Sequence, residues 1–405
     1  MKRVLIVGAG ECGLPIAHRL LRNGVAVTLL TDRDGDALLA GRVTSTQIKF
    51  APTLALETEA GLGVWRSTAP EIKGIRYTIV VDGHPAIRWN GRLSRPAQSV
   101  DQRTAFARWL GEVEAEGGVL RIADLTLAEI DRHSAEHDLT IATRAPGLLA
   151  ECFAPDLSWP ASQSSKRRLA VLYLFGVTPD PDDFGSYTVL PGHGEVISCR
   201  GLTGIPGREH PCEMVLLESV PGGCLDVFDA GQTPGELLKK TIALLALHLP
   251  PEAAVRYAAA ELTDSGATLV GGVTPTMRKP IGSLPSGKAI LGGGDAVCRM
   301  DPAGVQGANS AAQCAAHYAD AVLSHRGRRF GKPWMIEAAM PWLTGIAYPA
   351  ARWTATLLDP ASPLQDLFVA AQHDPELANE CAETFAQSRR QKALTARLRV
   401  GKIGR

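Results

Sequence analysis

A glycine-rich turn near the start of the chain constrains its fold more strongly than any other feature. Four apolar residues, Val4–Val7, stand before three glycines with GxGxxG spacing, which are Gly8, Gly10 and Gly13. The amphipathic run that follows, to Arg22, completes the order of a buried parallel strand, a tight turn and a helix. In such units the first glycine permits the turn, the second leaves room for a pyrophosphate and the third lets the helix pack on the strand. The motif therefore predicts a dinucleotide site; the alternative is a glycine-rich turn that binds nothing.

An acidic residue stands where the ribose of a bound dinucleotide is expected. A second predicted strand, Ala26–Leu30, leads to Asp32, which lies 19 residues beyond Gly13. A carboxylate at this distance typically accepts hydrogen bonds from the adenosine ribose hydroxyls. The helix N-terminus would add unpaired N–H groups and partial positive charge for the phosphates, and Arg42 is placed to reach one. FAD suits a motif at this position at least as well as NAD.

Charge and cysteine content narrow the classes of protein. Lys and Arg together number 42, as do Asp and Glu, so the formal net charge of the 405 residues is zero. This balance argues against nucleic acid or an anionic membrane surface as the main partner. The eight cysteines are scattered, without CxxC or zinc spacing, which predicts reduced thiols, no metal site and a cytoplasmic protein. No apolar stretch approaches the length of a membrane span.

The remaining pattern predicts an α/β fold with a discontinuous first domain. A Rossmann-type dinucleotide-binding domain would be interrupted by an inserted, mostly antiparallel sheet that forms a substrate domain, and a helical C-terminal region would follow. The predicted ranges are 1–45, 95–150 and 285–325 for the first domain, 46–94 and 151–284 for the second, and 326–405 for the C-terminal helices. Further strand-like runs are Ile75–Val81, Ala86–Trp89, Val119–Ile122, Leu139–Ala142, Leu169–Phe175, Tyr187–Leu190, Glu195–Cys199, Glu213–Glu218, Leu225–Phe228 and Ala289–Leu291. The predicted helices are Val100–Glu116, Thr233–Leu247 with a capping box at its start, Gly304–Leu323 and the tail from Pro333 to Val400.

A second polar loop occurs late in the chain, at Gly294–Asp295 and Asp301–Asn309. It follows a buried strand and opens a helix, so it can face the first glycine-rich turn. Asp295 can hydrogen-bond sugar or ribityl hydroxyls, and the N–H groups of Gly307–Asn309 can donate to carbonyl oxygens of a flat heterocycle. A helix N-terminus beside a flavin also stabilises negative charge on its reduced ring. The alternative is a glycine-rich surface loop in which Asp295 is an ordinary cap.

Together these motifs resemble those of the flavoprotein monooxygenases with the aromatic-hydroxylase fold, and most closely the styrene and indole monooxygenases, which are two-component epoxidases. The matching segments occur in the same order along nearly the whole chain. They are Gly8–Gly13, Thr31–Arg33, Ser99–Arg103, Pro191–Glu195, Gly271–Val273, Gly294–Asp295, Asp301–Pro302, Gln306–Asn309 and Ala351–Thr354. The Pro-Gly-His-Gly-Glu and Arg-Trp-Thr motifs make the resemblance specific, because they are rarely found together.

The resemblance implies a cofactor, a reaction and a set of site residues. FAD would be delivered reduced by a NAD(P)H-dependent flavin reductase, and O2 would epoxidise a small, neutral, styrene- or indole-like aromatic alkene, with thioether sulfoxidation as a side activity. No side chain would act as a catalytic acid or base, and a homodimer is a candidate assembly. The implied cofactor-binding residues are Gly8, Gly10, Gly13, Asp32, Arg33, Arg42, Arg103, Asp295, Pro302, Gln306, Gly307, Ala308 and Asn309. The implied substrate pocket lies over the flavin, beside Ser45, Thr46, Pro302 and Ala303.

Three positions depart from the family pattern. Relatives usually have Asn at the position of Ser45 and a bulkier aliphatic residue at that of Ala303, so we expect a differently shaped and larger pocket. Arg144 stands where relatives have glycine, and nothing in the sequence accounts for it.

Two other functions remain open from the sequence. A single-component, NAD(P)H-dependent hydroxylase of the same fold usually carries an Asp-Gly stretch after the strand that ends here at Ala142, and Thr143–Leu149 lacks it. A flavin-binding protein without oxygenase activity is the second alternative.

His193, flanked by glycines, is interpreted as a turn-stabilising residue in preference to a catalytic one.

Overall fold

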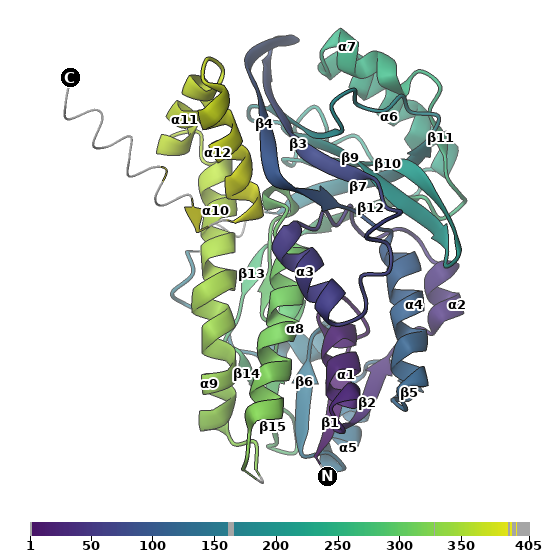
Figure 1. Ribbon diagram of the computed structural model, residues 1–405, viewed down its shortest axis with the longest axis vertical. Helices are drawn as coiled ribbons and strands as arrows, with labels where there is room; N and C mark the ends of the chain where they lie inside the picture. The colour runs from purple at the N-terminus through teal and green to yellow at the C-terminus, as the bar shows by residue number, and fades with distance from the viewer. Residues whose placement is uncertain (1, 161–165, 328, 388, 391–393, 395–405) are drawn as a thin grey trace, which may run out of the picture.

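Two large β-sheets lie one above the other along the long axis of the molecule (Figure 1). The computed structural model describes residues 2–160, 166–327, 329–387, 389–390 and 394. The first sheet occupies the lower part of Figure 1 and carries the glycine-rich turn, whereas the second occupies the upper part. The C-terminal helices run along one side of the molecule, where they reach both sheets.

The first sheet is parallel except at one edge. Its strand order is β14-β15-β6-β1-β2-β5, and β14 and β15 form an antiparallel hairpin. In this sheet Val4 pairs with Val27 on one side and with Leu139 on the other. The predicted Rossmann-type sheet, built from separate parts of the chain, is confirmed; the expected domain border between 284 and 285 falls inside the hairpin. The strands are β1 Arg3–Val7, β2 Ala26–Thr31, β5 Val119–Ile122, β6 Leu139–Ala142, β14 Ile281–Ser283 and β15 Ala289–Gly292.

Helices cover both faces of the first sheet because its central strand is apolar on both. Val4 and Ile6 pack with α1, α4 and α8 in one core cluster, whereas Leu5 and Val7 pack with α5 in another. None of these four side chains is exposed, so burial on both faces stabilises the strand. The helices are α1 Gly13–Arg22, α4 Gln102–Ala115, α5 Leu127–Ala135 and α8 Gly307–Ser324.

The second sheet is mostly antiparallel, as predicted. Its order is β11-β7-β10-β9-β8-β3-β4, with β12 also on β7, and β3 and β8 are parallel neighbours. The strands are β3 Glu71–Val81, β4 His84–Gln98, β7 Arg167–Phe175, β8 Phe184–Leu190, β9 Gly194–Ile205, β10 Arg208–Ser219, β11 Glu261–Leu262 and β12 Thr268–Val273. A separate two-stranded ribbon pairs β13 Thr276–Met277 with β16 Cys298–Arg299. Two short helices pack elsewhere: α2 Gly35–Leu39 lies against α4, and α3 Ala51–Glu59 lies against α8.

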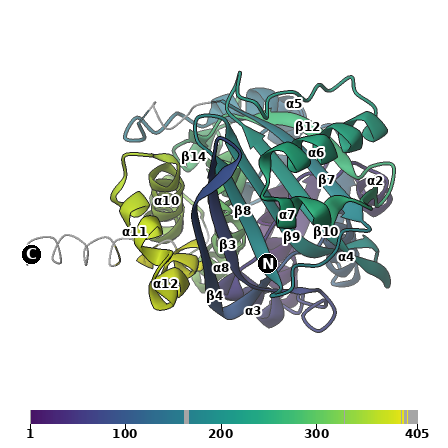
Figure 2. The same cartoon turned by 90° about the horizontal axis from the view of Figure 1, so that it is seen from above.

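Two helices, α6 (Pro234–His248) and α7 (Pro251–Ala254), cover the outer face of the second sheet (Figure 2). The predicted capping box is present: the Thr233 side chain accepts from the Glu236 N–H, and the Glu236 carboxylate accepts from the Thr233 N–H. The strand predicted at Leu225–Phe228 is wrong. Its two end residues, Leu225 and Phe228, are buried under α6 in an apolar cluster with Leu237 and Leu245, which we call the α6 cluster. The segment follows a proline–glycine turn and packs through its side chains, and it pairs with no described strand.

The C-terminal region is helical over its described length. Its helices are α9 Lys332–Trp342, a π-helical turn Leu343–Ala347, α10 Tyr348–Leu358, α11 Pro363–Ala371 and α12 Pro375–Ala386. Most of the tail predicted as helix beyond 390 lies outside the described residues. α12 packs along β4 so closely that Gly91 has no room for a Cβ atom. Within the described ranges, no helix is both long and apolar enough to cross a membrane.

The helix predicted from Gly304 begins three residues later, at Gly307. A 3₁₀ turn, Pro302–Gly304, comes first, and Val305 then adopts φ 55°, in the left-handed region. A β-branched residue in that conformation interrupts a right-handed helix, so α8 starts only after it. The predicted turn role of His193 is confirmed: it lies between β8 and β9, and its Nδ1 accepts from the Cys224 N–H at 3.2 Å.

Candidate active site

A cavity of about 550 Å³ lies between the two sheets, at the carboxyl ends of β1, β2 and β6. Residues that follow these strands, within 8–12, 31–33 and 143–145, form its lower wall. Side chains of β7, β9 and β10 from the second sheet form its upper wall. We call this space the main cavity. Ligands of open α/β sheets bind in the crevice outside the carboxyl ends of the strands, which is the position of this cavity.

The glycines of the main cavity leave a gap of the kind that a dinucleotide requires. Among the described residues, a Cβ atom built on Gly10 would have one neighbour, at 4.0 Å, and one on Gly307 would have none within 4 Å. By contrast, Gly8 has φ +106° and Gly13 packs directly on the Gly8 carbonyl. Gly8 and Gly13 are therefore required by the fold, whereas Gly10 and Gly307 keep space open for a ligand.

Two helices direct uncapped N-termini into the main cavity. α1 begins after Cys12 and α8 after Gln306, and neither of these side chains bonds to the first turn of its helix. Gly10 and Cys12 line the cavity beside α1, and Gly307 with Ala308 line it beside α8. Unpaired N–H groups and a partial positive charge are thus offered at two points. This arrangement fits FAD, which has an anionic pyrophosphate and, when reduced, an anionic ring.

The acidic residue at the end of β2, Asp32, is held by an arginine. Arg144 Nη1 donates to Asp32 Oδ2 at 2.6 Å, and Arg33 Nε lies 3.9 Å from Asp32 Oδ1. Partial burial works to raise the pKa of this carboxyl, but the two arginines outweigh it and lower the pKa. Asp32 is therefore an ionised acceptor at neutral pH. Arg144, which the sequence left without an explanation, is its partner.

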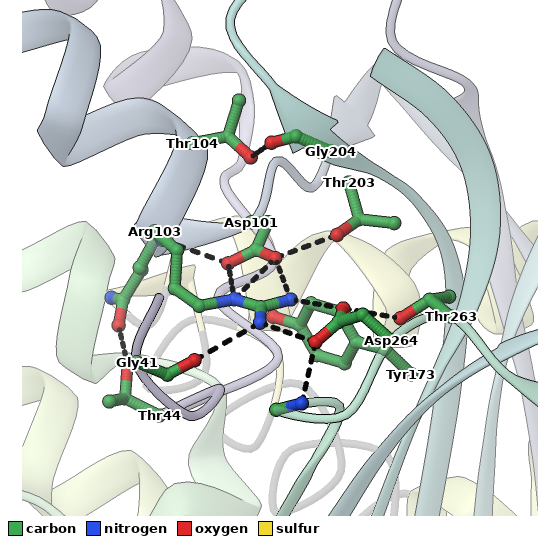
Figure 3. A network of polar contacts seen from close by, with 12 residues as sticks. Gly41, Thr44, Asp101, Arg103, Thr104, Tyr173, Thr203, Gly204, Thr263 and Asp264 are labelled. Atoms are coloured by element: carbon green, nitrogen blue, oxygen red, sulfur yellow. Dashed lines mark hydrogen bonds and ion pairs between the residues drawn. The ribbon is translucent and has the colours of Figure 1, made fainter. Parts of the chain in front are cut away.

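Arg42 and Arg103 both line the main cavity but differ in their partners. The guanidinium of Arg103 is held by two carboxylates, Asp101 and Asp264, at 2.7–3.3 Å (Figure 3). Its Nη1 also donates to the Gly41 carbonyl at 3.2 Å. Burial works to lower the pKa of Arg103, but hydrogen bonds and ion pairs with Asp264 and Asp101 outweigh burial, so the pKa is raised. Arg42 is exposed, and no described residue hydrogen-bonds or pairs with it, so its guanidinium is available to a phosphate.

Asp295 follows β15, and its side chain is exposed within the main cavity. Enclosure by the protein raises the pKa of this carboxyl, and the positive charges of Arg299 and Arg144 oppose the rise. No described residue donates a hydrogen bond to it. A hydroxyl donor from a ligand would stabilise the carboxylate and lower its pKa again, which suits contact with a sugar or ribityl chain.

Part of the main cavity is lined by aliphatic side chains of the second sheet. Of the predicted pocket residues, Ser45, Thr46 and Pro302 line the cavity. Sequence reasoning missed the aliphatic wall beside them, which consists of Leu169, Val171, Ile197, Leu216 and Val305. The spacing of the first two along β7 is the period of one sheet face, so strand alternation identifies such a wall once the inward face is known.

Four predicted site residues do not line the main cavity. Gly13 is taken up by helix packing, and Ala303 has no exposed surface because its turn packs against α10. Gln306 donates to a carbonyl of α12 at 2.7 Å. The Asn309 amide accepts from and donates to the segment 48–53, with distances of 2.8–3.0 Å. These contacts hold the walls of the cavity in place.

Sequence reasoning also missed a buried acid in the glycine-rich turn. Glu11 lines the main cavity at 7% exposure, and its Oε2 lies 2.9 Å from Lys49 Nζ. Lys49 also contacts Glu57 Oε1 at 2.5 Å. Burial raises the pKa of Glu11 to about 8, although the charge of Lys49 works against the rise. No local pattern marks this trio, because its members meet only in the folded chain.

Similar sequences include styrene monooxygenases. A family model described as the putative substrate-binding domain of styrene monooxygenase A matches residues 147–255, which include β7 to β10. The styrene monooxygenase StyA of Pseudomonas fluorescens is 28% identical over 401 residues, which cover 96% of this chain and 94% of that protein.

Solved structures agree in fold. A flavoprotein/dehydrogenase from Cytophaga hutchinsonii has a TM-score of 0.71 at 14% identity, covering 99% of this chain and 100% of its own. The p-nitrophenol 4-monooxygenase PnpA from Pseudomonas putida DLL-E4 has a TM-score of 0.62 at 15% identity, covering 96% and 99%. At these identities the likeness is one of fold.

The sequence relatives and the geometry of the main cavity together define the class of protein. It is a FAD-dependent flavoprotein monooxygenase of the two-component type, which uses the cofactor in its reduced form. The relatives favour this class over the alternative of a flavin-binding protein without oxygenase activity. Within this class, the chain is similar to the styrene monooxygenases, through the matched substrate-binding domain and the StyA relatives.

Proposed function

We propose that this protein transfers one oxygen atom of O2 to the carbon–carbon double bond of a small, neutral aromatic alkene of the styrene or indole type. The observation that carries the proposal is the continuity of the main cavity, which joins the dinucleotide end to the aliphatic wall of the second sheet. Such a wall accepts an aromatic ring by burying its apolar surface. It also offers no charge to a carboxylate or phenolate.

The residues of the main cavity would hold FAD along its length. We assign Asp32 to the adenosine ribose, and the α1 N-terminus with Arg42 to the pyrophosphate. Asp295 would accept from the ribityl hydroxyls, and the N–H groups of Gly307 and Ala308 would face the ring. The remaining predicted residues would shape the walls around the cofactor: Gly8, Gly13, Arg33, Arg103, Pro302, Gln306 and Asn309. When bound and reduced, FAD supplies the oxygen-transfer chemistry.

The protein's own part in the reaction is to bind, orient and exclude water. The aliphatic wall would hold the alkene, while Ser45 and Thr46 would border it with small hydroxyl side chains. Neither is placed as an acid or base, so the proposal includes no side-chain proton transfer to the substrate. An electrophilic oxygen then reacts with π electrons or, more slowly, with a thioether sulfur.

The proposal includes a NAD(P)H-dependent flavin reductase as a separate partner. The segment Thr143–Leu149, which would carry the Asp-Gly stretch of single-component hydroxylases, lacks it. The same segment holds Arg144, whose ion pair with Asp32 lies over the ribose end of the main cavity. Both features favour use of one dinucleotide, FAD, in preference to direct binding of a nicotinamide.

A reconstituted assay tests the proposal. The purified protein is incubated with FAD, NADH, O2 and a flavin reductase, and with styrene, indole or a phenolic acid in turn. We expect styrene oxide from styrene and, from indole, indoxyl that oxidises in air to indigo. Reactions with reductase and FAD but without the protein control for free peroxide.

Two outcomes would contradict the proposal. Hydroxylation of the phenolic acid, with neither alkene converted, would show that the pocket assignment is wrong. Substrate-stimulated oxidation of NADH without any reductase would show that the enzyme takes its electrons from the nicotinamide directly.

A further inference from the structure

Four buried charged side chains meet behind the main cavity. Arg167 on β7 forms an ion pair with Glu195 on β9. Its Nε lies 3.5 Å from Oε1 of Glu218 on β10, and its Nη1 lies 3.9 Å from Oδ2 of Asp301. All four residues are less than 9% exposed, and Glu218 is not exposed at all. We call these residues the carboxylate cluster.

The carboxylate cluster has more acids than bases. Three carboxyl groups surround one guanidinium, so full ionisation would leave two uncompensated negative charges, with Glu195 and Glu218 buried away from water. Such charges are strongly unfavourable, and a buried group takes up a proton instead. Neither carboxyl oxygen of Glu218 accepts a hydrogen bond from any described residue. The geometry therefore requires at least one proton among Glu195, Glu218 and Asp301.

The titration of the carboxylate cluster agrees with this count. Burial raises the pKa of Glu195 to about 7, against the opposing charge of Arg167. Burial and the neighbouring Asp301 raise the pKa of Glu218 well above its usual range, again against Arg167. Glu195 and Glu218 therefore titrate as coupled groups, and together they are partly protonated at neutral pH.

The carboxylate cluster lies in a wall between two cavities. Asp301 lines the main cavity, and its Oδ1 accepts from the Ala303 N–H at 3.0 Å, which fixes it beside Pro302. Asp301 and Arg167 also line a second cavity, of about 510 Å³, on the other side of the loop. A proton at Asp301 can therefore reach the main cavity on one side and exchange with water on the other.

Other titratable groups around the carboxylate cluster do not take over this role. Tyr187 on β8 and Tyr77 on β3 face Glu195, and burial raises the pKa of both above the usual range, so they stay neutral. Lys166, Arg299 and Asp359 line the second cavity. In the described part of the chain, no group of side chains is arranged to hold a metal ion.

We propose that the carboxylate cluster stores one proton at the Glu218–Asp301 pair and supplies it to the main cavity in each oxygenation. This inference rests on the proposed function. In the overall reaction the O–O bond breaks, one oxygen atom enters the substrate and the other leaves as water. Two electrons and one hydrogen of that water come from the reduced anionic flavin, which is oxidised, so one further proton is required. Asp301 gives up this proton from its carboxyl group, and the cluster regains one from water in the second cavity.

Infrared spectroscopy tests proton storage without any cofactor or turnover. Spectra of the purified protein are recorded in H2O and D2O at several pH values, and those of Glu218→Gln are subtracted. Glu11 is also protonated at neutral pH and contributes a band to both proteins, so the difference spectrum carries the test. We expect a protonated carboxyl band at neutral pH in the wild-type minus Glu218→Gln spectrum, and in the wild-type minus Asp301→Asn spectrum. No such band in either difference spectrum, with the variants shown to be folded by circular dichroism, would overturn the proposal.

The pH profile of a single turnover tests proton supply. Protein loaded with reduced FAD is mixed with oxygenated buffer containing indole. Wild-type product formation should be independent of pH below the titration of the cluster. In Glu218→Gln, and in Asp301→Asn as a second variant, it should be about 100-fold slower and rise about tenfold per unit fall in pH, because solvent must provide the proton. Unchanged rates and profiles in both variants would overturn the proposal.

A matched control is available on the same strand. Glu213 is also buried on β10, but it pairs with Arg256 at 3.3 Å and lines neither cavity. Glu213→Gln should therefore leave the pH profile of product formation unchanged. If the wild-type protein converts no alkene at all, the proposed function fails, whereas the infrared band still reports whether the carboxylate cluster holds a proton.

Discussion

Arg144 Nη1 lies 2.6 Å from Oδ2 of Asp32, and this ion pair joins the end of β6 to the end of β2 across the glycine-rich turn of β1. Both side chains are partly exposed, at 49% and 34%. The pair therefore closes the ribose end of the main cavity with an interaction that water weakens. A ligand whose ribose needs both oxygens of Asp32 has to displace Arg144.

Replacing Arg144 should strengthen FAD binding. In Arg144→Gly the ion pair no longer has to be broken, and an exposed pair is worth up to about 1 kcal/mol, so the Kd for FAD should fall by up to about fivefold. Titration of the apoprotein with FAD measures this. Arg19→Ala, which removes a surface ion pair with Asp320, is the control and should leave the Kd unchanged. A Kd that rises tenfold in Arg144→Gly would instead show that Arg144 binds the cofactor.

Filling the gap at Gly10 should abolish FAD binding and leave the fold intact. A side chain there has space in the apoprotein but occupies the room for the pyrophosphate, so Gly10→Val should raise the Kd at least about 100-fold. Urea unfolding should show nearly wild-type stability. Gly111→Val, at an open position in α4, is the matched control and should bind FAD normally. Normal FAD binding by Gly10→Val would place the cofactor elsewhere.

Reduced FAD should bind more tightly than oxidised FAD. The uncapped N-terminus of α8 faces the main cavity, and a helix N-terminus stabilises a nearby negative charge by about 0.3 to 2 kcal/mol. The ratio of the two dissociation constants should therefore lie between about 2 and 30. Anaerobic and aerobic titrations measure it, with FMN as a control that lacks the adenosine end. Equal affinities would contradict the assignment of the ring to α8.

Glu11 should make the folded protein less stable as the pH rises. Burial raises the pKa of Glu11 from 4.5 to about 8, so between these values the folded state holds a proton that the unfolded state has lost. Its stabilising contribution is complete below about pH 4.5 and disappears as the pH passes about 8. Relative to Glu11→Gln, the free energy of unfolding should fall over this window by up to about 1.4 kcal/mol per pH unit.

Urea unfolding of both proteins at several pH values measures the difference. Glu59→Gln, at an exposed position in α3, should show no such slope. A difference that grows with pH in favour of the wild type would contradict the burial of a neutral Glu11.

Substitutions of two neighbouring leucines of β10 should distinguish an effect on substrate binding from an effect on stability. Leu216 faces the main cavity, whereas Leu217 points to the α6 cluster on the other face. Truncating either to alanine should destabilise the fold by about 2 to 5 kcal/mol. Only Leu216→Ala should alter kcat/KM for styrene and admit bulkier alkenes, because it enlarges the aliphatic wall. Steady-state kinetics with alkenes of graded size measure this, and equal effects of both variants would remove Leu216 from the pocket.

The sheets could be predicted because their signals are local. An apolar run such as Val4–Val7 and the glycines after it report a strand and a turn within a dozen residues. Leu225–Phe228 shows the limit, since an apolar run that packs under α6 has the same composition as one that pairs in a sheet. The β14 strand was not predicted either, because three residues carry too little pattern.

Residues of the candidate site could be predicted only where they belong to a local sequence motif with a known binding role. Gly10 and Asp32 belong to such a motif. Asn309 was predicted to bind the cofactor, yet its amide is used by the segment 48–53, a pairing set by three-dimensional proximity alone. The carboxylate cluster likewise depends on contacts between distant segments, since it brings together three strands and a loop. No residue spacing in the sequence predicts it.

The hairpin of β14 and β15 also determines when the first sheet can be completed. Ribosomes release the amino-terminal end first, so β1, β2, β5 and β6 emerge long before β15, which pairs with β6. Until then β6 is an unpaired edge, and the sheet face later covered by α8 stays open. Strands β7 to β12 of the second sheet are synthesised during this wait, so the nascent chain must keep an apolar half-sheet from aggregating. Only after α8 has left the ribosome do the two glycine-rich loops that flank the main cavity face each other.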